Sequence, residues 1–138
     1  MERIMPHVKR INHVAVVVDD MEKALSFWRD ALGMKLYELR DVSAEKSQVA
    51  FLPLPGSEVE LVMPTTDDSG IAKYLAKRGA GMHHICLEVD DIEEMMAQLK
   101  SRGVRLINEE PRIAVDGKKY AFIHPESTSG VLVELYQI

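Results

Sequence analysis

Cysteine is nearly absent: Cys86 is the only one among 138 residues. A single thiol excludes an internal disulfide framework and a metal site built from several thiolates. Cys86 lies inside an apolar run, where we expect it to act as a small buried hydrophobic side chain. This cysteine usage is typical of a reducing compartment, and we predict a cytoplasmic protein.

Long hydrophobic runs and blocks of positive charge are also absent. No apolar run approaches the roughly 18 residues of a membrane span, and the first ten residues, MERIMPHVKR, lack the apolar centre of a signal peptide. The net charge is -5, with no cluster of Lys or Arg that would attract nucleic acid or an anionic membrane. We therefore expect a small-molecule partner, and neither nucleic acid nor a membrane.

The residues that are present suffice for one folded domain. With 46% hydrophobic and 28% charged residues, a chain of 138 residues can bury a substantial core. We predict a single domain over residues 1–138.

An internal duplication organises this domain. The segment NHVAVVVDDMEKALSFWRDALGMKL aligns with HHICLEVDDIEEMMAQLKSRGVRL at a constant offset of 71 residues. Each copy begins with a strand of alternating apolar residues and continues with D-D-x-E, followed by a helical pattern that a glycine ends. We expect Asp19 and Asp90 to cap the two helices, with Glu22 and Glu93 completing each capping box.

Short runs typical of strands follow each predicted helix. They are MKLYELRDV, SQVAFLPL and EVELVMP in the first copy, and RLI, KKYAFIHP and GVLVELYQI in the second, where NEEPRIAVDG reads as a loop or a weak edge strand. The fold class is therefore α+β, two tandem β-α-β-β-β modules forming a curved, cup-like mixed sheet. We place module 1 at about 10–64, a linker helix at about 65–81 and module 2 at about 82–138.

Matching histidines and glutamates occur in the two copies. His84, and not His83, is the counterpart of His13, and a V-E-L motif near the end of each copy contains Glu60 or Glu134. Because side chains alternate along a strand, all four point away from their strand's apolar side. If each module forms half of a cup, one His and one Glu from each half line its inside.

Two imidazoles and two carboxylates suit a divalent ion such as Co, Ni, Mn, Fe or Zn. Octahedral coordination would leave two positions for a bidentate ligand. For other polar residues we expect structural roles or leave two open: His83 lies on the opposite face and reaches solvent, a loop or the mouth of the site, Glu88 lies at a rim or interface, and His124 serves either a turn or a substrate contact.

The chain resembles the vicinal oxygen chelate superfamily, and within it the methylmalonyl-CoA epimerases. INHVAVVVDDMEKALSFW, the helix region PTTDDSGIAKYLAKRGAG before MHHICLEVDDI, GVRLINEEPR and FIHPESTSGVLVEL carry the resemblance, which extends from Ile11 to Gln137. It implies interconversion of (R)- and (S)-methylmalonyl-CoA by proton abstraction and return at carbon 2 through a metal-stabilised enolate. It also implies His13, Glu60, His84 and Glu134 as metal ligands, a homodimer, and a divalent ion, with Co²⁺ favoured over Ni²⁺, Mn²⁺ or Zn²⁺.

The resemblance assigns one catalytic base to Glu134, but this chain lacks a glutamate at the position of the family's second base. Some family members carry a separate Glu on the strand before Glu60, where this chain has Val49 beside Gln48. Neither side chain can take a proton, so Glu60 itself is the expected second base. Glyoxalase I, which has the same ligand pattern, and a non-catalytic ligand-sequestering protein like the bleomycin-resistance proteins remain alternatives. Five cations are candidates for the phosphates of coenzyme A: Lys77, Arg78, Arg112, Lys118 and Lys119.

Overall fold

The structure, a computed structural model, describes residues 5–138; the beginning of the leader segment, residues 1–4, lies outside the described residues. The chain divides into two compact units. We call His13–His83 the first-copy unit, and Met1–Asn12 together with His84–Ile138 the second-copy unit. Strand β1 (Val8–Val17) contributes its beginning to the second-copy unit and its end to the first-copy unit.

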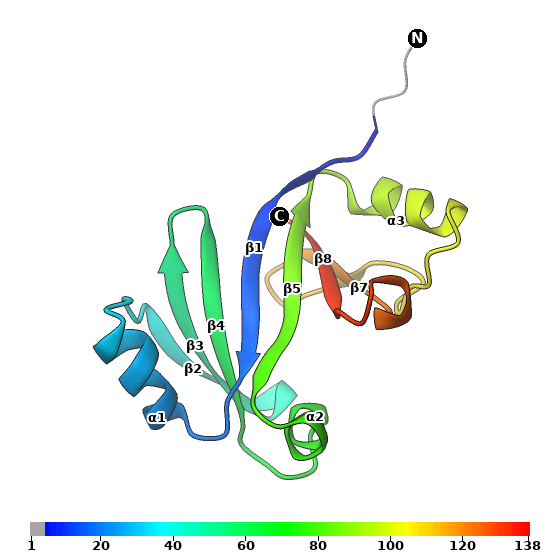
Figure 1. The fold of residues 1–138 in the computed structure, drawn as a ribbon. Coiled ribbons are helices and arrows are strands. Elements are labelled where there is room, and N and C mark those ends of the chain that lie inside the picture. Colours follow the sequence, from blue (N-terminus) through cyan, green and yellow to red (C-terminus); the bar gives the residue numbers. More distant parts are fainter. Residues whose placement is uncertain (1–4) are drawn as a thin grey trace. The chain divides into compact units, whose positions relative to one another are not determined.

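The first-copy unit contains a sheet in which β4 lies between β3 and the end of β1 (Figure 1). Strand β1 runs parallel to β4, and the other neighbouring strands are antiparallel. The remaining elements of this unit are β2 (Glu38–Val42), β3 (Ser47–Leu54), β4 (Ser57–Pro64), α1 (Met21–Leu25), the π-helix η1 (Ser26–Ala31), the 3-10 helix η2 (Ser43–Glu45) and α2 (Gly70–Arg78).

One face of this sheet packs against α1. Ala50, Leu52 and Leu61 are completely buried there, in one cluster with Met21 and Leu25 of the helix. Since strand side chains alternate between faces, the residues adjacent to these in sequence point to the other face, away from α1. That other face carries the polar residues of interest.

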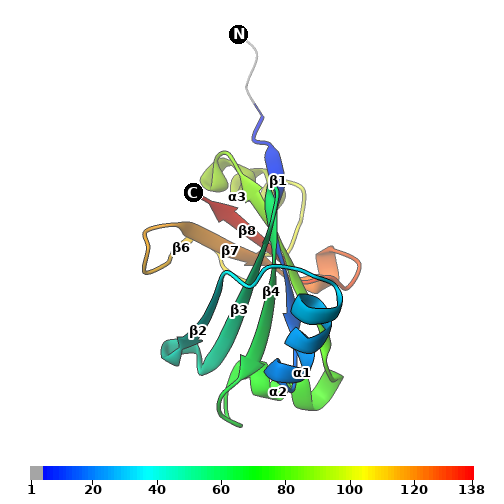
Figure 2. The ribbon, with the colours of Figure 1, turned by 90° about the vertical axis from the view of Figure 1, so that its left-hand side faces the viewer.

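The second-copy unit repeats the arrangement with the strand order β5-β8-β7-β6, whose β7 and β8 are visible in Figure 2. Strand β5 runs parallel to β8, and α3 packs its Ile92, Met95 and Met96 against the sheet residues Ala121 and Leu135. The elements are β5 (Gly81–Val89), α3 (Ile92–Ser101), β6 (Arg112–Ile113), β7 (Lys119–Ile123), the 3-10 helix η3 (Pro125–Ser127) and β8 (Val133–Gln137).

The fold class is α+β, as predicted, because each unit combines a mixed sheet with a helix, α1 or α3, packed on one face. In the part of the chain that the structure describes, no helix has the length and apolar character needed to cross a membrane.

The helix caps were predicted one residue too early. Asp20 and Asp91 cap the two helices, accepting hydrogen bonds from the backbone N–H groups of Lys23 and Glu94 at 3.1 and 3.0 Å. Asp90 instead accepts a hydrogen bond from the backbone N–H of His7 at 2.9 Å, which lowers the pKa of the Asp90 carboxyl. The predicted capping boxes also fail, because Glu22 and Glu93 no longer stand three residues after the cap.

Replacing the true cap should destabilise the protein, and replacing its neighbour should not. Asp20→Ala removes the acceptor for the Lys23 N–H, and we expect a loss of about 0.5–2 kcal/mol in the free energy of unfolding. Asp19→Ala is the matched control, with an expected change within about 0.5 kcal/mol. Urea denaturation measures both, and equal losses in the two variants would contradict the assignment.

Two predicted elements differ from the structure. The RLI run is not a strand, because only Leu106 forms an isolated bridge, with Ile123, and the short edge strand is Arg112–Ile113 in the segment read as a loop or weak edge. The first helix changes after Leu25 to a π-helix over Ser26–Ala31.

Candidate metal-binding and catalytic site

His13 and Glu60 meet on the face of the first-copy sheet that is turned away from α1. Strand β1 pairs in parallel with β4 so that Ala15 lies beside Glu60, and His13 is two residues earlier on the same face. The His13 Nδ1 atom lies 3.2 Å from a Glu60 carboxylate oxygen, and the two side chains are only 10% and 18% exposed. An imidazole and a carboxylate are thus held together in a largely dry environment.

His84 and Glu134 form the equivalent pair in the second-copy unit. Strand β5 pairs in parallel with β8, with Cys86 beside Glu134, and His84 is again two residues earlier on the same face. The His84 Nε2 atom lies 3.2 Å from a Glu134 carboxylate oxygen, and the side chains are 13% and 12% exposed. Each unit therefore holds one His–Glu pair at the same place in its sheet.

The surroundings of the two pairs match as well. On the antiparallel neighbour strand, Phe51 lies directly opposite Glu60, and Phe122 lies directly opposite Glu134. The Phe122 ring packs edge-on against the His84 imidazole, with 5.7 Å between the ring centres. The sequence interpretation missed both phenylalanines, although they stand 71 residues apart, the offset of the duplication.

Arg40 adds a cation beside the first pair. Its guanidinium forms two 2.8 Å hydrogen bonds with the Glu38 carboxylate and lies 4.7 Å from the centre of the Phe51 ring. The hydrogen bonds to Glu38 raise the pKa of Arg40, and the negative charge of Glu60 raises it further. In the sheet register Arg40 pairs with Val49, and Arg112 pairs with Tyr120, which stands 71 residues after Val49, so the second-copy unit also has an arginine at the corresponding position.

Cys86 lies on the polar face and not in the helix-side core. It occupies the position that Ala15 has in the first copy, and its sulfur is within 4.8 Å of a carboxylate oxygen of Glu134. The side chain is fully buried, as expected for this residue, but its neighbour is a carboxylate.

Glu88 is a buried charge, which contradicts the expectation of a rim or interface position. Its side chain is 4% exposed, accepts a hydrogen bond from Asn12 at 3.2 Å, and has Lys9 and Arg10 nitrogens at 3.6 and 3.8 Å. These partners belong to the beginning of β1, in the same unit as Glu88. We infer that Glu88 fastens that strand, since a buried carboxylate requires compensating cations and donors.

The remaining candidates have structural contacts. His83 packs edge-on against Tyr74 of α2, with 4.6 Å between ring centres, and His124 accepts the backbone N–H of Glu126 at 3.0 Å, which is the turn role. Val49 is 6% exposed, and Gln48 donates to Asp41 at 3.3 Å. Strand β3 thus supplies no base at either position.

Comparison with known proteins identifies the class of protein. A model of the glyoxalase/bleomycin resistance protein/dioxygenase superfamily matches residues 12–122. The chain therefore belongs to this superfamily, in agreement with the duplicated units and their matching His–Glu pairs.

Individual relatives identify the family within this superfamily. The mitochondrial methylmalonyl-CoA epimerase of Mus musculus is 43% identical over 129 residues, which are 93% of this chain and 72% of that protein. The ethylmalonyl-CoA/methylmalonyl-CoA epimerase of Cereibacter sphaeroides is 40% identical over 133 residues, which are 95% of this chain and 99% of that protein. A solved methylmalonyl-CoA epimerase in complex with methylmalonyl-CoA and NH4+ has a TM-score of 0.81 at 31% identity, covering 95% of both chains. Within the superfamily, the chain belongs to the family of the methylmalonyl-CoA epimerases.

Proposed function

We propose that the protein is a metal-dependent epimerase that interconverts (R)- and (S)-methylmalonyl-CoA. The observation that carries the proposal is the pair of matched His–Glu contacts, one in each unit, in a chain whose relatives include methylmalonyl-CoA epimerases at 40–43% identity. The substrate has an acidic carbon between a thioester carbonyl and a carboxylate, so a positioned base can remove its proton once the resulting charge is stabilised.

The donor set fits a divalent ion. His13, Glu60, His84 and Glu134 offer two imidazole nitrogens and carboxylate oxygens, and within each unit a contact of 3.2 Å brings one nitrogen and one oxygen donor together. We propose these four residues as the metal ligands, with Co²⁺ as the favoured ion. When bound, such an ion supplies Lewis-acid stabilisation of the negative charge that develops when the carbon-2 proton leaves.

We propose that two carboxylates, those of Glu134 and Glu60, carry out the proton transfers. Glu134 removes or returns the proton on one face of the planar intermediate, and Glu60 serves the other face. Phe51 and Phe122, which flank the two carboxylates, help to keep water away from them. Limited water contact favours transfer of the abstracted proton back to carbon.

Neighbouring histidines allow a test of the ligand set. His84→Ala should reduce the affinity for Co²⁺ by more than about 100-fold, because even residues that only support a ligand contribute about 10–100-fold. His83→Ala is the matched control, since His83 points to the opposite face and contacts Tyr74. Metal content after dialysis, measured by mass spectrometry, gives the result; equal metal content in both variants would remove His84 from the ligand set.

Assembly and location complete the proposal. We propose a homodimer in the cytoplasm, with the active site formed within one chain. Light scattering during gel filtration measures the molar mass, and twice the 15.6 kDa of one chain is expected.

A further inference from the structure

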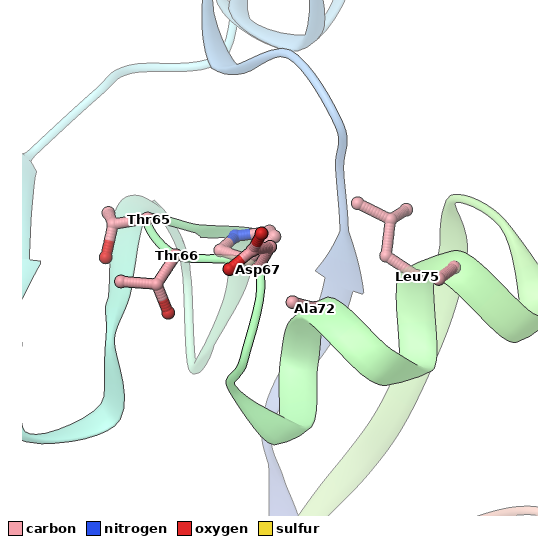
Figure 3. A pocket seen from close by; sticks show the side chains of 7 residues that line it. Thr65, Thr66, Asp67, Ala72 and Leu75 are labelled. Atoms are coloured by element: carbon pink, nitrogen blue, oxygen red, sulfur yellow. The ribbon is translucent and has the colours of Figure 1, made fainter.

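A groove lies between α2 and the loop that connects it to β4, all within the first-copy unit (Figure 3). Its volume is about 390 Å³, and its walls are residues 64–67 of the loop and Ala72, Leu75 and Ala76 of the helix. We call it the α2 groove. None of the four proposed ligands lines it.

The two walls of the α2 groove differ in chemistry. The loop wall contains Thr65, Thr66 and Asp67, and the Thr66 hydroxyl donates a 2.7 Å hydrogen bond to Asp68, whereas Ala72 and Leu75 make the helix wall apolar (Figure 3). A carboxylate in the wall disfavours a phosphate or another anion. The groove instead suits an uncharged chain that combines amide and hydroxyl groups with apolar carbons.

The α2 groove is continuous with the face that carries the His13–Glu60 pair. Along β4, Glu60, Val62 and Pro64 alternate onto that same face, and Pro64 is also part of the groove. Glu60 and Pro64 are four residue steps apart along the strand, which corresponds to about 13 Å.

We propose that the α2 groove binds the pantetheine arm of the acyl-CoA substrate, an inference that rests on the proposed function. The arm is uncharged and contains two amides, a hydroxyl and a dimethyl-substituted carbon. Its chain from sulfur to the first phosphate oxygen has about twelve bonds, as many as four peptide residues, and extends over about 13 Å. A thioester held at Glu60 therefore places the arm along Val62 and its far end in the groove.

Two cations of α2 lie next to the groove, where the phosphates of coenzyme A would follow the pantetheine arm. Lys73 and Lys77 are exposed neighbours of the groove residues Ala72 and Ala76, and among the described residues neither has a carboxylate within ion-pair distance. By contrast, two of the cations considered from the sequence are engaged, Lys118 with Asp116 and Lys119 with Glu93. We assign Lys73 and Lys77 to the nucleotide phosphates, which lie beyond the arm.

Substrates of different length test this assignment. Deuterium exchange at carbon 2 is measured with methylmalonyl-CoA, methylmalonyl-pantetheine and the methylmalonyl thioester of N-acetylcysteamine. Ala76→Trp fills the groove and should raise KM at least tenfold for the first two substrates, with less than a twofold change for the third. The double variant Lys73→Glu/Lys77→Glu should raise KM only for methylmalonyl-CoA, since only this substrate carries the phosphates.

Matched controls separate this effect from general damage. Ala97→Trp introduces the same side chain at an exposed position of α3, and Lys23→Glu/Lys35→Glu reverses the same two charges at exposed positions elsewhere; neither should change KM for any substrate. Equal KM values for Ala76→Trp and Ala97→Trp would overturn the assignment, as would an equal effect of Ala76→Trp on all three thioesters.

Binding of coenzyme A itself, measured by calorimetry, distinguishes failure of this inference from failure of the proposed function. We expect the wild-type protein to bind coenzyme A and Ala76→Trp to bind it at least tenfold more weakly. Exchange of the short thioester without any weakening of coenzyme A binding in Ala76→Trp would overturn the groove assignment and leave the epimerase proposal intact. Weaker binding of coenzyme A by Ala76→Trp, together with no exchange of any thioester by the wild-type protein, would support the groove assignment and overturn the epimerase proposal.

Discussion

Glu134→Gln is expected to reduce epimerisation of methylmalonyl-CoA by about 10²–10⁴-fold while metal remains bound. Gln keeps an oxygen that can serve as a ligand but cannot take a proton, so the substitution removes the base alone, and a positioned general base contributes a factor of this size. The rate is measured by the appearance of the opposite stereoisomer, and metal content is determined on the same sample.

Glu126→Gln is the matched control for this variant. Glu126 is exposed and paired with Arg105 at 2.7 Å, so its replacement should leave the rate within about twofold. A Glu134→Gln protein with full metal content and full turnover would show that Glu134 is not a base.

Glu60→Gln is expected to reduce epimerisation by about 10²–10⁴-fold as well, but with a different pattern of exchange. Because each base serves one face, a protein that retains only one base can still exchange the carbon-2 proton of one stereoisomer. We therefore expect Glu60→Gln and Glu134→Gln to retain exchange with opposite stereoisomers. Deuterium incorporation at carbon 2, measured by mass spectrometry after each pure stereoisomer is incubated with each variant in heavy water, tests this expectation.

Two further variants make this test specific. Glu58→Gln changes a carboxylate on the same strand and face, two residues before Glu60, and should retain full turnover. Val49→Glu added to Glu60→Gln should recover part of the rate, because Val49 occupies the position where some family members carry the second base. Retention of exchange with both stereoisomers in Glu60→Gln would exclude Glu60 as a base.

The residues of the two His–Glu pairs could be predicted because the chain is duplicated. Strand alternation placed His13 and His84 opposite the apolar side, and the repeated V-E-L motif singled out Glu60 and Glu134. The structure adds that each His contacts the Glu of its own unit at 3.2 Å. That partnership depends on parallel pairing of β1 with β4 and of β5 with β8, which periodicity alone does not specify.

Local competition between similar residues explains the incorrect predictions. In each D-D pair either carboxylate can cap a helix, and in both copies the second aspartate does so, while Asp90 accepts a hydrogen bond from His7, 83 residues away in the sequence. The burial of Glu88 likewise depends on Lys9 and Arg10, which precede the aligned copies. Contacts between segments so far apart in the sequence cannot be predicted from the pattern of neighbouring residues.

The α2 groove is absent from the sequence prediction for a related reason. The helix region was identified as a linker, and its Ala72, Leu75 and Ala76 show only the three- and four-residue spacing of an ordinary apolar face. Whether such a face is covered or left open depends on the path of residues 64–67. The candidate cations for coenzyme A similarly could be sorted only after their ion pairs were known.

The most direct test of the proposed function is deuterium exchange at carbon 2 of methylmalonyl-CoA in heavy water, with metal-stripped protein and with protein reloaded with Co²⁺. We predict exchange only in the reloaded sample, together with formation of the opposite stereoisomer; the hemithioacetal of methylglyoxal, the substrate of glyoxalase I, should not be converted. No exchange by fully loaded protein, or equal exchange with and without metal, would contradict the account.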